Sequence, residues 1–375
     1  MDFTLDSEQT ALRDAVRALL KGYDAEHRRE VVAEDPGFDE GMWGKLAEMG
    51  LLGLPFSEDD GGMGAGPVEL SLVAEEIGRV VAPEPYVESV VMAGGLVAAA
   101  GTSEQKKEIL GALSAGELVL AAAVLEPEGR WDLAAGGVTA SDGKLTGVKE
   151  PVLAGGRADL FVVSATTSDG LALFLVEPGD GVEVTGYATL DGSRAARVAF
   201  DGASATPLGD GTVDALQALE RVVAAAKIAY CHESLGLMES AMKLTTDYLT
   251  TRKQFGMTLN RFQALTFRAA DMYTSLELTR SIVSWASMVL ADRSSTAAQV
   301  TEAARRAKLQ VSTAGRHIGQ EAIQLHGGIG MTMEYAVGHM TARLTAIDHL
   351  LGDGREQTKH LAETLTDHGV VEPLP

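Results

Sequence analysis

Arg252-Lys253-Gln254-Phe255-Gly256 follows one long predicted helix, and Gln324-Leu325-His326-Gly327-Gly328 ends another. These two stretches decide how the chain is interpreted. An arginine can hold a pyrophosphate through paired, charge-assisted hydrogen bonds. A phenylalanine offers an apolar wall, and paired glycines allow a backbone to approach a ligand closely. Both stretches therefore have the composition of a nucleotide-binding site.

Either stretch alone has a structural explanation. Gly327-Gly328 could cap a helix, and Arg252 could pair with Asp247 at the corner of a helical bundle. When both stretches are taken together with Gln263, we favour the binding site over the bundle corner.

The composition limits the classes of function. At 375 residues the chain is too long for one ordinary core, so two or three domains are expected. Acidic residues outnumber basic residues by 53 to 31, which gives a formal charge of -22. Without a basic cluster, neither nucleic acid nor an anionic membrane is expected as a partner. The absence of an apolar leader or spanning segment predicts a cytoplasmic protein.

Hydrophobic periodicity divides the chain into three expected domains. Residues 1–117 should form an N-terminal α-helical domain, with helices near residues 39–49 and 68–80. In residues 118–210, short β-prone runs alternate with turns, as expected for an antiparallel β-sandwich or barrel. Residues 211–375 should form a C-terminal α-helical bundle. The expected fold is therefore an α+β multidomain protein. The turns are predicted at Asp142-Gly143, Asp169-Gly170, Asp191-Gly192 and Asp201-Gly202, and the bundle helices near residues 214–251, 262–290 and 296–325.

This order of domains and several motifs resemble the acyl-CoA dehydrogenase family over nearly the whole chain. Residues 46–53 with 58–64 are similar to its N-terminal signature, and residues 101–107 to the segment before its first strand. The two opening stretches, with Phe262-Gln263 between them, resemble its C-terminal flavin signature. The resemblance implies that FAD takes a hydride from the β-carbon of an acyl-CoA thioester while a glutamate removes a proton from the α-carbon.

The proton-accepting glutamate is absent at both positions where the family carries it. The usual position precedes a glycine and matches Leu351, and the alternative position on the long helix matches Ala226. Neither side chain can accept a proton. Carboxylates lie near these positions, but we interpret them as solvated helix surface or helix caps rather than as a relocated base. They are Asp348, Asp353, Glu220 and Glu233.

The residues that would orient the flavin ring are also replaced. The resemblance places hydroxyl side chains at the positions of Leu125 and Trp131, and a Trp-x-Thr motif at Pro151 and Leu153. A further hydroxyl position matches Asp353, whose charge is unfavourable next to a flavin phosphate or ring oxygen. Losing several donors removes the hydrogen bonds that orient the ring. Trp131 could also wall off the ring pocket.

The residues that reach a neighbouring subunit's cofactor are retained. They match Arg252, Phe255, Gln263, Gln324, Gly327 and Gly328. We therefore expect an unequal pair, in which this chain completes the FAD of a different partner chain. Some members of the family are α2β2 heterotetramers with half the usual number of flavins, and they act on CoA esters of bulky steroid side chains.

Two alternatives remain open at this point. The chain could be a self-sufficient homo-oligomer with a relocated base such as Asp348 or Glu233. It could also be a non-catalytic scaffold that binds neither flavin nor CoA. His317 with Glu321, and His349 with Asp353, are four residues apart, but no second His or Cys joins either pair at ligand spacing, so no metal is expected.

Overall fold

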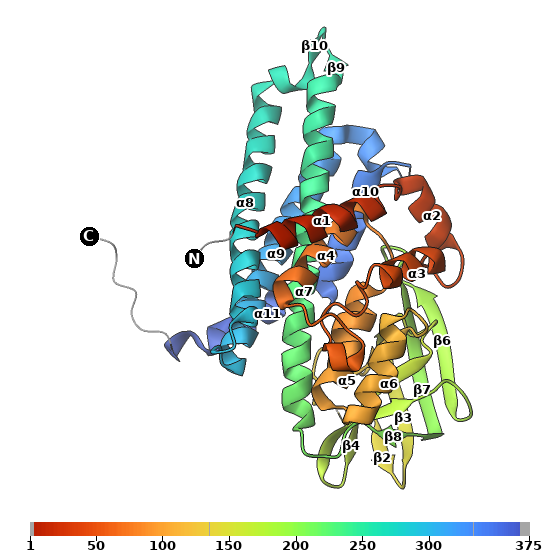
Figure 1. Ribbon diagram of the computed structural model, residues 1–375. Coiled ribbons are helices and arrows are strands. Elements are labelled where there is room, and N and C mark those ends of the chain that lie inside the picture. Colours follow the sequence, from red (N-terminus) through yellow and green to blue (C-terminus); the bar gives the residue numbers. More distant parts are fainter. Residues whose placement is uncertain (1–3, 135, 333, 368–375) are drawn as a thin grey trace.

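The computed structural model of the chain describes residues 4–134, 136–332 and 334–367 and has three parts (Figure 1). The helices expected near residues 39–49 and 68–80 are present as α3 and α4. The Asp6 side chain caps α1 and the Asp39 side chain caps α3, because each carboxylate accepts an otherwise unpaired N–H group. The N-terminal part contains α1 (Ser7–Leu20), α2 (Ala25–Ala33), α3 (Glu40–Glu48), η1 (Glu58–Asp60), α4 (Pro67–Val80), the π-helical η2 (Tyr86–Gly94), α5 (Gly95–Ala100) and α6 (Ser103–Ser114).

The middle part is a single eight-stranded sheet with the order β6-β7-β3-β2-β4-β5-β8, and β1 pairs with β4. Its strands are β1 (Leu120–Ala123), β2 (Thr139–Ser141), β3 (Lys144–Leu153), β4 (Leu160–Thr167), β5 (Gly170–Val176), β6 (Val182–Ala188), β7 (Arg194–Ser204) and β8 (Thr206–Pro207). Apolar side chains from several strands form a second core beneath the sheet.

Two details of the expected sheet were wrong. The pairing is not entirely antiparallel, because β1 and β2 both run parallel to β4. No tight hairpin joins these strands to β4, so nothing forces them to be antiparallel. Asp201-Gly202 is not a turn between strands but lies inside β7. The register of β7 against β3 shifts there, and Gly202 has a φ of +63°, which identifies a β-bulge.

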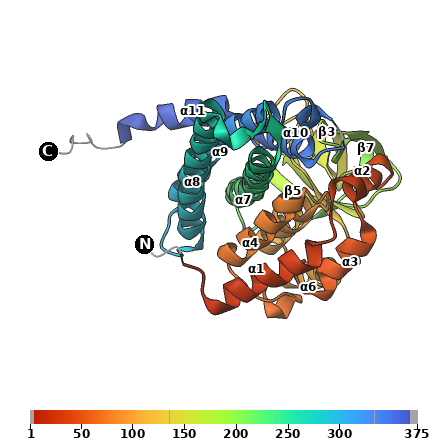
Figure 2. The same cartoon turned by 90° about the horizontal axis from the view of Figure 1, so that it is seen from above.

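The C-terminal part is built around α7 (Ala215–Thr251), a helix of 37 residues that is about 55 Å long. Figure 2 shows α7 between α4 and α1 on one side and α9 on the other. In Figure 1, α7 and α8 run side by side and project beyond the rest of the chain. After α7 follow β9 (Lys253–Gln254), β10 (Met257–Thr258), η3 (Leu259–Arg261), α8 (Gln263–Ala291), α9 (Ala297–His326), η4 (Gly327–Met331), α10 (Ala336–His349), α11 (Gly354–Glu363) and η5 (Leu365–Asp367).

The three long helices agree with the expectation, whereas α10 and α11 were not predicted. Both are short, and α10 begins after Tyr335 without a side-chain cap, so no start signal marks it in the sequence. Among the described residues, no helix is both long and apolar enough to cross a membrane.

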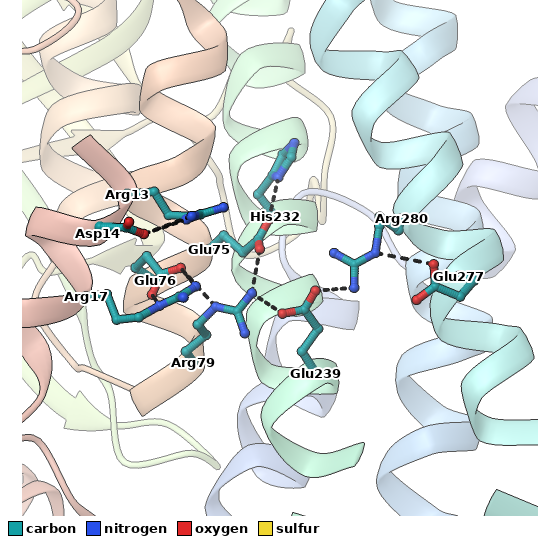
Figure 3. A network of polar contacts seen from close by, with 10 residues as sticks. All are labelled: Arg13, Asp14, Arg17, Glu75, Glu76, Arg79, His232, Glu239, Glu277 and Arg280. Atoms are coloured by element: carbon teal, nitrogen blue, oxygen red, sulfur yellow. Dashed lines mark hydrogen bonds and ion pairs between the residues drawn. The ribbon is translucent and has the colours of Figure 1, made fainter. Parts of the chain in front are cut away.

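A network of ion pairs ties the N-terminal part to the bundle (Figure 3). Arg17 of α1 pairs with Glu76 of α4 at 2.7 Å, and Glu76 also accepts a hydrogen bond from Arg79 at 2.9 Å. Arg79 reaches Glu239 of α7, and Glu239 binds Arg280 of α8. Glu76 and Glu239 are 2% and 10% exposed, whereas the arginines are partly exposed, so the network links four helices through two buried carboxylates.

Glu84 is a buried carboxyl group next to η2. Its Oε1 accepts hydrogen bonds from the Tyr23 hydroxyl at 2.8 Å and from the Asp39 N–H at 3.3 Å. Its Oε2 has no partner among the residues that the structure describes. Burial raises the pKa of Glu84 to about 7. In the unfolded chain this carboxyl group loses its proton above the ordinary glutamate pKa of about 4.3. Between that pH and about pH 7, the folded chain therefore keeps a proton on Glu84 that the unfolded chain has released.

This pKa predicts how stability depends on pH. The contribution of Glu84 is fully present below about pH 4 and is lost as the pH rises to about 7. Glu84→Gln should remove this loss, because an amide does not ionise. At each pH, the effect of the substitution is the unfolding free energy of the variant minus that of wild type. We expect this difference to be about 2–3 kcal/mol more positive at pH 8 than at pH 4.5. Denaturant titrations at both pH values measure this difference. The exposed Glu128→Gln should show none, and a Glu84→Gln effect independent of pH would contradict the assignment.

Candidate functional site

The first site stretch forms a hairpin at the tip of the projecting helices. Strands β9 and β10 are joined by Phe255 and Gly256, whose φ values are +51° and +80°. Positive φ is unfavourable for a residue with a side chain, and Phe255 is also 88% exposed. Within the chain its ring meets only the edge of Phe262, at a centroid distance of 6.2 Å, among the described residues, so most of this strained phenyl group is available for a contact outside the chain.

The second site stretch lies at the same end of the bundle. The Tyr248 ring of α7 contacts the His326 ring of α9 at a centroid distance of 4.6 Å. Arg268, one turn into α8, donates to Glu321 of α9 at 2.9 Å. The ends of α7 and α9 and the start of α8 therefore meet at one surface, which we call the tip. It carries all six retained residues, and all six are exposed: Arg252, Phe255, Gln263, Gln324, Gly327 and Gly328.

Arg252 has no internal partner. Its guanidinium makes no hydrogen bond or ion pair with any other residue in the described ranges, and Asp247 pairs instead with Lys243 at 2.7 Å. The structural alternative in which Arg252 pairs with Asp247 is therefore wrong. The capping alternative holds in part, because Gly327 takes a φ of +66° at the end of α9. This cap still leaves Gly327 and Gly328 exposed.

The tip is basic, although the whole chain is strongly acidic. No aspartate or glutamate occurs between Asp247 and Asp271, whereas this interval contains four cations. They are Arg252, Lys253, Arg261 and Arg268, of which Arg268 is paired with Glu321. Local cations of this kind attract an anionic ligand despite the net charge of -22.

A separate cavity of about 390 Å³ lies between η2, the middle part and the segment that joins α10 to α11, and we call it the internal pocket. Its volume lies within the range of small-molecule sites. The structure brings together in its wall six residues from three separate segments, at the positions where the resemblance implies the ring and the base. They are Leu125, Trp131, Pro151, Leu153, Leu351 and Asp353. Ala226, the alternative base position, does not line the pocket and is fully buried in the core.

Glu126 is a carboxylate of the internal pocket whose two oxygens both accept hydrogen bonds. It accepts hydrogen bonds from the Lys149 ammonium at 2.8 Å and from the N–H groups of Gly137 and Val138. Burial alone would raise its pKa, but the bond from Lys149 and these N–H groups outweigh burial and hold the pKa of Glu126 low. A carboxylate held ionised in this way is a weak base.

The other acidic groups of the internal pocket are also engaged or solvated. Glu88 accepts the Tyr230 hydroxyl at 2.9 Å. Asp353 caps α11 by accepting two backbone N–H groups of its first turn, as the sequence analysis allowed. Glu150 is partly exposed, 3.7 Å from Arg197. None of these groups is a dry, free carboxylate of the kind that proton abstraction requires.

The two candidates for a relocated base lie outside the internal pocket. Asp348 faces a neighbouring surface depression with Arg316. Our interpretation of Glu233 as solvated surface was wrong, because this residue is only 2% exposed. Arg343 of α10 binds both of its oxygens, at 2.6 and 3.1 Å. The periodicity of α7 could not reveal this pairing, because the partner is more than a hundred residues away.

Arg343 is the centre of a buried ionic cluster that the sequence analysis missed. Besides Glu233, it binds Asp191 at 3.0 Å and lies 3.6 Å from Glu88. Burial raises the pKa of Glu233. For Asp191, burial acts in the same direction, but Arg343 and nearby hydroxyl groups outweigh it and hold the pKa low. The cluster joins α10 and α7 to η2 and to the β6–β7 turn, so it connects all three parts.

The internal pocket and the tip differ in how well they fit a flavin nucleotide. The internal pocket offers apolar side chains where the ring would need hydrogen-bond donors, so it does not fit an isoalloxazine. The tip offers a free guanidinium, an exposed phenyl group, two amides and paired glycines, which suit the adenosine diphosphate end of a dinucleotide. Among the described residues, no group of three or more His, Cys, Asp or Glu side chains is arranged to hold a metal ion.

Comparisons with known proteins give a consistent result. The family model for the acyl-CoA dehydrogenase N-terminal domain matches residues 6–117, and that for the C-terminal domain matches residues 215–366. The chain is 29% identical over 374 residues to acyl-CoA dehydrogenase FadE27 of Mycobacterium tuberculosis, which covers 98% of this chain and 99% of that protein.

Two similar solved structures are each named for two components. A variant of the Tcur3481-Tcur3483 steroid ACAD is 30% identical, has a TM-score of 0.87, and covers 97% of this chain and 99% of that one. The ChsE4-ChsE5 complex from Mycobacterium tuberculosis is 26% identical, has a TM-score of 0.88, and covers 99% of this chain and 100% of that one.

Proposed function

Because the chain belongs to the acyl-CoA dehydrogenase family, we propose that it is the non-catalytic subunit of a heteromeric FAD-dependent acyl-CoA dehydrogenase. In this assembly it completes the FAD site of a different chain, which supplies the ring pocket and the base. FAD is the cofactor of this family, and it supplies the hydride acceptor when bound.

One contrast carries the proposal. All six retained residues are exposed at the tip, where they can serve a neighbour, whereas the replaced residues other than Ala226 line this chain's own internal pocket. A self-sufficient enzyme would need both surfaces to be functional. Replacement of the residues of the internal pocket alone is the pattern expected when another chain supplies the reaction centre.

In this role the residues at the tip bind and orient the cofactor. Arg252 would form paired hydrogen bonds with the pyrophosphate, and Phe255 would pack against the nucleotide. Gln263 and Gln324 would donate or accept hydrogen bonds, and the Gly327-Gly328 backbone would approach the ligand closely. Positioning of this kind contributes to catalysis without proton transfer by this chain.

The relatives support a heteromer and suggest the substrate class. Two similar structures are each named for two components; one is called a complex, and the other a steroid ACAD. We therefore propose an α2β2 assembly with a second acyl-CoA dehydrogenase chain, acting on a CoA thioester with a bulky side chain such as that of a steroid. The charge of -22 also disfavours self-association relative to a less acidic partner.

The test is to count flavins. Tagged chain is purified from its native host together with its partner, and FAD is measured by absorbance against the protein mass of the complex. About one FAD per two chains supports the proposal, because this fold offers one site per subunit. One FAD per chain, or a yellow protein when this chain is made alone, would reject it.

Two alternatives have less support. A homo-oligomer with a relocated base would need Asp348 or Glu233 at the internal pocket, and neither lines it. A scaffold without cofactor contact would leave the exposed phenyl and free guanidinium at the tip without a purpose. It would gain support if a co-purified partner bound FAD equally well after Arg252→Ala and Gln324→Ala.

A further inference from the structure

The internal pocket has a neighbour with which it shares a wall. This second cavity has a volume of about 480 Å³, lies between α7, α9 and α11, and is called here the outer pocket. Three side chains line both cavities: Leu125, Trp131 and Leu351. These three residues therefore lie between the two cavities.

The outer pocket has unpaired positive charge. Lys227 and Arg221 form no hydrogen bond or ion pair with another described residue, and the Nε of Arg305 is buried without a partner. Burial, together with the nearby Arg305 and Lys308 cations, lowers the pKa of Lys227 to about 8. The carboxylates of the pocket are Glu220, Glu302 and Glu356, of which Glu356 is held by His360 at 2.9 Å. An anion would compensate the free cations.

The two cavities together have the character of a site for an amphiphilic anion. The outer pocket would hold the anionic group, and the internal pocket, with Leu153, Leu350 and Met92 in its wall, would hold the apolar group. The CoA thioester of the proposed reaction is a ligand of this class. Such a ligand would have to pass between the two cavities.

We propose that Trp131 closes this chain's own ligand site by blocking the passage between the internal and outer pockets. The proposal rests on the proposed function, since it explains why only the partner would hold substrate. Trp131 acts here by its bulk and by its position between the two cavities.

Trp131 is fixed in the blocking position from both sides. Its indole N–H donates to the backbone oxygen of His349 at 3.0 Å, which ties the middle part to the end of α10. Its loop begins at Glu126, which three donors anchor, and Arg130 lies over the indole ring at 5.9 Å. A turn bond from Asp132 N–H to the Gly129 oxygen, at 2.9 Å, closes the loop. The indole is therefore held rather than free to swing aside.

The test uses the full chain purified without a partner, so that only its own site is measured. The probe is S-octyl-CoA, a thioether that cannot be dehydrogenated, titrated by isothermal calorimetry. Trp131→Ser removes the indole and should bind the probe at least about tenfold more tightly than wild type, with one site per chain. Trp131→Ala should behave in the same way, which guards against misfolding of one variant.

Trp131→Phe is the matched control. It removes the hydrogen bond to His349 but keeps an aromatic ring in the passage, so it should bind as weakly as wild type. The proposal is overturned if wild type binds as tightly as Trp131→Ser, if neither small variant binds better, or if Trp131→Phe binds like Trp131→Ser. These outcomes are distinct from failure of the proposed function, which would appear as FAD bound by the wild-type chain alone.

Discussion

Replacing Arg252 with alanine is expected to weaken FAD binding by the assembly, although in the proposed pair Arg252 belongs to the chain that does not supply the base. The guanidinium is exposed and has no internal partner, so its removal should leave the fold intact. Hydrogen bonds to a charged group contribute about 1.5–3 kcal/mol each, which corresponds to roughly 10- to 100-fold weaker FAD binding. Titrating the apo-complex with FAD and following dehydrogenase activity measure this loss.

Arg293→Ala is a matched control for this prediction. Arg293 is also exposed and unpaired within the described ranges, but it lies between α8 and α9 at the far end of the bundle from the tip. It should leave FAD affinity unchanged. Gln324→Ala, which removes one amide at the tip, should weaken FAD binding by a smaller factor. Equal losses in Arg252→Ala and Arg293→Ala would show a general charge effect and contradict a specific contact.

Arg343→Met is expected to have the largest effect on stability. The variant leaves Glu233 and Asp191 buried, with Glu88 beside them, and without their shared cation. Removing one partner of a buried ion pair typically costs about 3–5 kcal/mol, because the remaining charge stays desolvated. Guanidinium denaturation of the purified chain, compared with wild type at the same pH, measures the change in unfolding free energy.

Two further variants test the cause of this effect. Arg316→Met removes an arginine whose side chain is 70% exposed and lies 3.5 Å from Asp348, so it should cost no more than about 1 kcal/mol. Glu233→Gln combined with Arg343→Met should be less unstable than the sum of the single changes, because one stranded charge is removed. Strictly additive effects would mean that the two side chains do not interact.

Much of the fold could be predicted from local patterns. The helices α3, α4, α7, α8 and α9 follow from apolar periodicity and from capping residues such as Asp39 and Asp214, which act within a few residues of each helix start. The parallel pairing of β1 with β4 could not be predicted, because it joins segments that no hairpin connects. The bulge at Gly202 had the same Asp-Gly pattern as a true turn, and only the register against β3 distinguishes them.

For the candidate site, too, the sequence predicted the residue types but not their positions in space. The residue types at the tip could be read from the sequence, and so could the apolar residues Leu125, Trp131 and Leu351 at positions where the resemblance implies hydroxyl donors and a base. Their arrangement could not. Exposure of Phe255 and the freedom of Arg252 depend on where neighbouring helices end. Glu233 was misjudged for the same reason, because its partner Arg343 lies on another helix.

The sequence by itself determined which chemical groups this chain possesses and which it lacks, since a leucine cannot take up a proton in any fold. Only the tertiary structure decided which groups face outward and which face a cavity. That distinction depends on contacts between segments distant in the chain, such as Trp131 with His349 and Arg343 with Asp191, and no local pattern encodes such contacts.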